Sequence, residues 1–228
     1  MHFIILGIII LGVVFGPQLW ARYTFNRYNK QQDHFPGTGG ELAQHLINKF
    51  ELHSVKLETT DKGDHYDPES RTVRLSPQYF DGKSITAIAI AAHEVGHAVQ
   101  HAQNHPMLNL RSRLVKTAFV AEKIGSLAII AIPVITLITR APSAGVLVFI
   151  IAIGSMLIST LVHLVTLPVE WDASFSKALP VLKSGKYIND QEVAATKKVL
   201  RAAALTYVAG SLASLLNLWR WLAVLRRR

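Results

Sequence analysis

The chain has no cysteine in its 228 residues, and only 17% of its residues are charged. The absence of cysteine excludes a disulfide-stabilised scaffold and a zinc site with thiolate ligands. A metal site in this chain must therefore be built from histidine and carboxylate side chains. The charges are also unbalanced, with 24 Lys and Arg against 15 Asp and Glu, which gives a net charge of +9. Such a charge is typical of proteins that bind nucleic acid or an anionic membrane surface.

Long apolar runs favour the membrane over nucleic acid. Hydrophobic residues make up 50% of the chain, and the longest runs cover residues 3–20, 117–139, 143–167 and 202–225. A helix of roughly 20 residues crosses a bilayer core of about 30 Å. We therefore expect a lipid bilayer, and no nucleic acid, as a partner. The runs predict one membrane-embedded domain over residues 1–228, a mainly α integral membrane protein with about four transmembrane or membrane-embedded helices.

The distribution of Lys and Arg predicts the orientation of these segments. No basic residue precedes the first run, which we interpret as an uncleaved N-terminal anchor, whereas Arg22 and Arg27 follow it. By the positive-inside rule, residues 21–116 face the cytoplasm, and a hairpin over 117–165 returns residues 166–201 to the same side. The last run, 202–225, precedes three arginines, and the sequence leaves open whether it crosses the membrane.

The first cytoplasmic segment predicts a small α+β region. Thr38 and Glu41 have the spacing of a capping box, which predicts an amphipathic helix over 39–51. Alternating residues and polar turns further along predict a short β-hairpin or a three-stranded sheet. The expected strands are 54–58, 65–66 and 72–75.

The residues that carry chemistry lie in a helix expected over 84–105, between the N-cap Ser84 and Pro106. His93-Glu94-Val95-Gly96-His97 matches H-E-x-x-H, in which both histidines leave one face of the helix and can bind one zinc ion. Glu94 follows the first ligand directly and is placed to act as general base toward a zinc-activated water. We therefore predict a zincin-like catalytic region with one Zn²⁺ per chain, metal ligands His93 and His97, and catalytic Glu94.

A catalytic zinc with two histidines needs a third protein ligand. His101 lies about 12 Å from His93 along the helix axis, too far to share the ion. Glu170, just beyond the third apolar run, completes a His2Glu set. Asp172 is the competing ligand or a group that orients a ligand histidine, and His163 within that run is a further alternative.

Several motifs together resemble the YugP-type family of membrane zinc metallopeptidases, and the resemblance covers almost the whole chain. It is also similar, more distantly, to HtpX-type membrane proteases, which carry a zinc-binding Glu in a Glu-x-x-Ala-Asp pattern after a membrane hairpin. Here Glu170 and Ala173 fit that pattern, whereas Ser174 stands at the Asp position, so Asp172 or Ser174 is expected beside the ligands. The family motifs are Asp64-His65-Tyr66-Asp67-Pro68, Ala91-Ala92-His93-Glu94-Val95-Gly96-His97-Ala98-Val99-Gln100, Thr166-Leu167-Pro168-Val169-Glu170 and Ala202-Ala203-Ala204-Leu205-Thr206-Tyr207-Val208-Ala209.

The resemblance implies a metalloendopeptidase that cleaves a peptide or membrane-protein substrate at the inner (plasma) membrane of a bacterium, with the active site facing the cytoplasm. His65 and Tyr66 are candidates for oxyanion or substrate contacts, although their run is equally typical of a hydrogen-bonded turn. A membrane adaptor or quality-control scaffold with a structural zinc is the alternative function. A transporter is disfavoured by the few charges in the apolar runs. A membrane-protein partner and a homo-oligomer both remain open.

Overall fold

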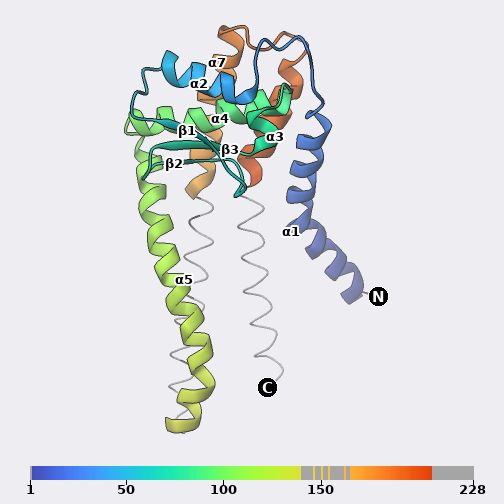
Figure 1. Cartoon of the computed structure of the whole chain (residues 1–228). Coiled ribbons are helices and arrows are strands. Elements are labelled where there is room, and N and C mark those ends of the chain that lie inside the picture. Colours follow the sequence, from blue (N-terminus) through green and yellow to red (C-terminus); the bar gives the residue numbers. More distant parts are fainter. Residues whose placement is uncertain are drawn as a thin grey trace. The chain divides into compact units, whose positions relative to one another are not determined.

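The computed structural model describes residues 2–139 and 165–206, together with the single positions 146, 150, 154 and 162. Two compact units arise from the chain. One comprises Met1–Gly16, Leu110–Thr166 and Tyr207–Arg228, and the other comprises Pro17–Asn109 and Leu167–Thr206. The elements are α1 (His2–Arg27), α2 (Gly39–Lys49), β1 (Lys56–Thr59), β2 (His65–Asp67), β3 (Thr72–Leu75), α3 (Pro77–Phe80), α4 (Ile85–Ala102), α5 (Pro106–Thr139), the π-helical segment η1 (Asp172–Ala178) and α7 (Leu179–Ser184) (Figure 1).

The sheet in the second unit has three strands in the order β1-β3-β2. β2 pairs with β3 antiparallel, with Tyr66 opposite Val73, so the hairpin expected from the sequence is confirmed. β1 pairs with β3 in parallel, with Leu57 opposite Val73. Val73 and Leu75 on the central strand are completely buried, because alternate residues of β3 point into the core. The sheet therefore has two edges, and β2 forms one of them.

The capping box predicted for α2 is confirmed. Thr38 accepts a hydrogen bond from the Glu41 N–H at 3.2 Å, and the Glu41 carboxylate accepts one from the Thr38 N–H at 2.8 Å. The helix ends at Lys49, two residues earlier than expected, because Glu51 takes a left-handed backbone with φ of 55°. Leu46, on the apolar face, is 1% exposed, and its burial contributes about 1.5–3 kcal/mol.

α4 lies between α2 and the sheet, and contacts both (Figure 1). Ser84 caps the helix as predicted, since its hydroxyl accepts the Ala87 N–H at 3.0 Å. The helix ends at Ala102 rather than at residue 105, because Asn104 is left-handed with φ of 52° and Pro106 begins the next helix. Every residue from Ile85 to Gln100 is buried, so the H-E-x-x-H motif lies in the interior of its unit.

The prediction of an integral membrane protein with about four transmembrane helices is wrong for the part of the chain that the structure describes. There, no helix is both long enough and apolar enough to cross a membrane. The apolar runs did not reveal where the helices begin and end. α5 starts at Pro106, not at residue 117, and includes Lys116 and Lys123. The uncharged part that follows is shorter than the roughly 20 residues that a bilayer core takes.

α1 likewise does not end with the first run and continues through Arg22 and Arg27. Residues 143–167 and 202–225 lie mostly outside the described residues. Of the expected architecture, the described part retains the helical majority and the small sheet before α4.

Candidate metal centre

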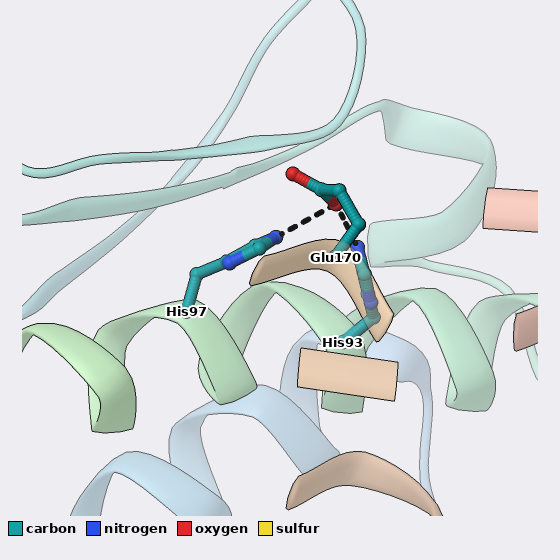
Figure 2. Close-up of side chains that lie close together, drawn as sticks. All are labelled: His93, His97 and Glu170. Atoms are coloured by element: carbon teal, nitrogen blue, oxygen red, sulfur yellow. Dashed lines mark hydrogen bonds and ion pairs between the residues drawn. The ribbon is translucent and has the colours of Figure 1, made fainter. Parts of the chain in front are cut away.

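Three buried side chains, His93, His97 and Glu170, converge in the unit that contains α4 (Figure 2). Glu170 Oε2 lies 3.2 Å from His93 Nε2 and 3.1 Å from His97 Nε2. The candidate ligand atoms all lie within 4.8 Å of one another. The two histidines are each 4% exposed and Glu170 is 0% exposed. Among the described residues this is the cluster of His, Asp and Glu side chains with the spacing of a metal site.

Helix geometry and a close helix contact bring the three together. His93 and His97 lie four residues apart on α4 and leave the same face of it, as Figure 2 shows. Glu170 lies two residues before the start of η1, which packs on α4. Gly96 permits this contact, because a Cβ at that position would lie 2.9 Å from the Ala173 carbonyl oxygen. The glycine inside the motif therefore lets the segment that carries Glu170 approach the two histidines.

Ser174 determines the tautomer of His93. Its hydroxyl donates its one hydrogen to the Leu200 carbonyl oxygen at 3.2 Å, so it can only accept from His93 Nδ1 at 3.0 Å. The hydrogen of the neutral His93 ring is therefore on Nδ1. Its Nε2 carries a lone pair directed at the centre of the cluster.

Gln100 determines the tautomer of His97, a role that the sequence analysis did not predict. Its amide nitrogen donates to the Val169 carbonyl oxygen at 2.9 Å and to Asp172 Oδ2 at 2.8 Å, which uses both of its hydrogens. The amide oxygen therefore faces His97 Nδ1 at 2.9 Å and accepts its hydrogen. The signal in the sequence was the spacing, because Gln100 lies three residues after His97 on one helix face.

The Glu170 carboxyl group is ionised. Burial raises its pKa, but the neighbouring His97 and His93 rings lower it by more, so the net pKa lies below its usual range. A cation bound between the two rings and the carboxylate would hold the carboxylate in this form.

This donor set fits a zinc ion. Two imidazole lone pairs and one carboxylate oxygen face one another, and Ser174 and Gln100 hold the ring hydrogens on the far side. Such acceptors repel one another unless a cation lies between them. Two histidines and one glutamate are the ligand set of many catalytic zinc sites, and these leave one position open.

Asp172 and Ser174 lie beside the three clustered side chains rather than among them. Asp172 reaches His97 through Gln100, and its Oδ2 is 3.9 Å from His105 Nε2. Ser174 contacts His93 directly. Glu94 follows His93 on α4 and is 7% exposed.

The structure places His65 and Tyr66 in other contacts. The His65 ring bonds to the Gly63 carbonyl oxygen at 2.8 Å, and the Tyr66 hydroxyl bonds to His101 Nδ1 at 2.7 Å. Neither contact involves the clustered side chains, and the oxyanion role stays a prediction. His163 lies outside the described residues.

Comparison with known proteins gives the same chemistry. A family model described as "Putative neutral zinc metallopeptidase" matches residues 3–226. A protein of Bacillus subtilis (strain 168) named "Putative membrane protease YugP" is 36% identical over 229 residues, which covers 98% of this chain and 96% of the relative. No solved structure matches. The resemblance read from the sequence motifs is thereby confirmed, and the chain belongs to this family of zinc metallopeptidases.

Proposed function

We propose that the protein is an endopeptidase that holds one Zn²⁺ with His93, His97 and Glu170 and uses Glu94 as general base. The observation that carries the proposal is the convergence of two imidazole nitrogens and a carboxylate oxygen on one point. The family description and the name of the relative both specify a protease or peptidase. A structural zinc site, the alternative, requires four protein ligands, and the cluster in the described part of the chain supplies three.

Each residue of the proposed site has a distinct chemical role. Zinc in such a site supplies a Lewis acid and lowers the pKa of water to about 7. Glu94, adjacent to His93, takes the proton of the attacking water on a carboxylate oxygen and later gives it to the leaving amine. Ser174 and Gln100 hold the two rings in the orientation that presents Nε2. Burial of the three ligands keeps competing water away and strengthens these interactions.

Two substitutions test the roles separately. Glu94→Gln should leave about one zinc per chain and abolish peptide hydrolysis, because the amide cannot accept the proton. Glu170→Gln should reduce the zinc content, because a neutral amide replaces the ionised ligand. Metal analysis of the purified variants, with cleavage of a quenched fluorescent peptide library, measures both effects. Retained turnover in Glu94→Gln contradicts the mechanism, and unchanged zinc in Glu170→Gln contradicts the ligand assignment.

We also propose that the protein acts at a membrane, on peptide or membrane-protein substrates, with its site on the cytoplasmic side. Support comes from the name of the Bacillus subtilis relative and from large apolar side chains on α5. Phe119, Leu137 and Ile138 are 70%, 79% and 75% exposed, which is typical of surfaces that meet lipid or another protein.

The absence of cysteine permits a direct test of the side. A single cysteine at the exposed position Lys62 should react with a membrane-impermeant maleimide only after the cells are lysed. Labelling of intact cells would refute the cytoplasmic orientation.

A further inference from the structure

A cavity of about 260 Å³ lies at the end of α4, in the same unit as the metal centre. It is bordered by the segment before β1, by β2, and by the turn between β2 and β3. Its polar lining consists of Ser54, Tyr66, Arg71, His101 and Asn104. These side chains offer hydrogen-bond donors and one permanent positive charge, and no carboxylate of the described residues lines the cavity.

Arg71 supplies that charge. One of its guanidinium nitrogens donates to Ser54 Oγ at 3.1 Å. Within the described residues Arg71 forms no ion pair with a carboxylate, whereas Arg74 on β3 pairs with Glu58 and Asp67. An arginine carries five N–H donors in a planar fork that matches a carboxylate. Arg71 therefore retains the capacity to bind an anion in the cavity.

Tyr66 and His101 form the wall beside this arginine. Burial raises the pKa of Tyr66 to about 12, so its hydroxyl keeps its hydrogen. Burial and the charge of Arg71 lower the pKa of His101. The Tyr66 hydroxyl and His101 Nδ1 share a hydrogen bond of 2.7 Å. Neither side chain brings a negative charge that would compete with an anion for Arg71.

The backbone holds two of these residues in an uncommon conformation. Arg71 and Asn104 both have φ of 52°, in the left-handed region that residues other than glycine adopt rarely. Such conformations are strained and cluster at binding sites. Two of them border one cavity.

The cavity lies close to the metal centre along α4. His101 is four residues beyond His97, which is about 6 Å along the helix axis and about 40° around it. An extended peptide spans about 3.3 Å per residue. A substrate with its scissile bond at the metal centre would bring a group about two residues away to the level of His101.

We propose that this cavity is a subsite for a carboxylate of the peptide substrate, which forms an ion pair with Arg71. The proposal rests on the peptidase function proposed above. The carboxylate belongs either to an Asp or Glu side chain or to the C-terminus of the peptide. Both sources have the same chemistry, and matched peptides distinguish them.

The test measures binding rather than turnover. Fluorescent peptides with one Glu at successive positions, their Gln counterparts, and forms with a free or an amidated C-terminus are titrated into the zinc-loaded full-length Glu94→Gln protein. Fluorescence anisotropy reports the affinities. At one position, or at the C-terminus, the acidic peptide should bind about tenfold more tightly than its neutral counterpart, which is about 1.4 kcal/mol.

Variants of Arg71 connect this preference to the cavity. Arg71→Met should reduce the ratio of the two affinities to about one, and Arg71→Lys should restore part of it, because the charge returns without the planar fork. Arg201→Met removes an exposed arginine that does not line the cavity and should keep the full ratio. Thermal unfolding shows whether each variant is folded, and the Lys variant serves if the Met variant is not.

The outcomes separate this proposal from the peptidase function. A ratio of one at every position, or a ratio that Arg71 variants leave unchanged, overturns the subsite even where the wild type cleaves peptides. A preference that depends on Arg71 supports the subsite even where the wild type cleaves none, and the peptidase function alone would then fail.

Discussion

Gln100 is the residue whose replacement tests the construction of the metal centre most directly. It is completely buried and joins His97, the Val169 carbonyl and Asp172 through three hydrogen bonds. In Gln100→Leu a side chain of similar size removes all three. The His97 Nδ1 hydrogen and the Val169 carbonyl oxygen then stay buried without their partner. Asp172 is 24% exposed at its side chain and can be hydrated instead.

The magnitudes follow from these contacts. A buried polar group without a partner costs about 1–3 kcal/mol, so two such groups should lower the free energy of unfolding of the zinc-free protein by about 2–6 kcal/mol. Loss of a group that orients a ligand histidine reduces metal affinity about 10- to 100-fold. The zinc affinity should therefore fall by about 1.4–2.7 kcal/mol.

Competition with a chromophoric chelator measures the zinc affinity, and denaturant unfolding of the zinc-free protein measures the stability. Gln103→Leu is the matched control, because Gln103 is exposed on the same chain segment and accepts one hydrogen bond, from Lys177. Surface changes of this kind stay within about 0.5 kcal/mol. Equal zinc affinities in Gln100→Leu and Gln103→Leu would refute the argument that Gln100 orients His97.

Three further changes test other contacts. Ser174→Ala leaves His93 Nδ1 without its acceptor and should reduce zinc affinity about 10- to 100-fold, with Ser174→Thr retaining more of it; equal affinities in both variants and the wild type would contradict the tautomer argument. Gly96→Ala places a methyl group 2.9 Å from the Ala173 carbonyl oxygen. It should lower the free energy of unfolding by about 1–3 kcal/mol and weaken zinc binding. A variant as stable as the wild type would show that the contact between α4 and η1 is loose. The pKa of Asp67 is lowered from 3.8 to about 2, mainly by the hydrogen bond that the Ser70 hydroxyl donates to it, so the stability that the Asp67 carboxylate contributes is present above pH 4 and is lost as the pH falls toward 2. The difference in unfolding free energy between the wild type and Asp67→Asn, measured in denaturant, should therefore shrink over that range. A constant difference would refute this linkage.

The membrane prediction shows where a sequence pattern alone was insufficient. A run of apolar letters indicates that a segment avoids water, but it does not say at which residues a helix begins or ends. α5 begins at Pro106 and includes Lys116, so the helix starts well before the apolar run that begins at residue 117. The same limitation placed the end of α4 at residue 105, whereas Asn104 turns the chain after Ala102.

Local interactions determined what the sequence established by itself. The missing cysteines restricted the ligands to histidine and carboxylate, the four-residue spacing put His93 and His97 on one face of a helix, and the Thr38 and Glu41 pattern marked the start of α2. Each of these depends on residues within one or two helical turns, whose geometry is the same in every fold.

The tertiary structure decided everything that joins distant segments. Glu170 lies 73 residues beyond His97, and its position beside the two histidines depends on how η1 packs against α4 at Gly96. The roles of Gln100 and Ser174 became visible only with their partners, Val169, Asp172 and Leu200, in place. The cavity beside Arg71 likewise depends on how the β2-β3 turn meets the end of α4. These contacts between distant segments depend on how the core packs, and the spacing of residues along the chain does not predict them.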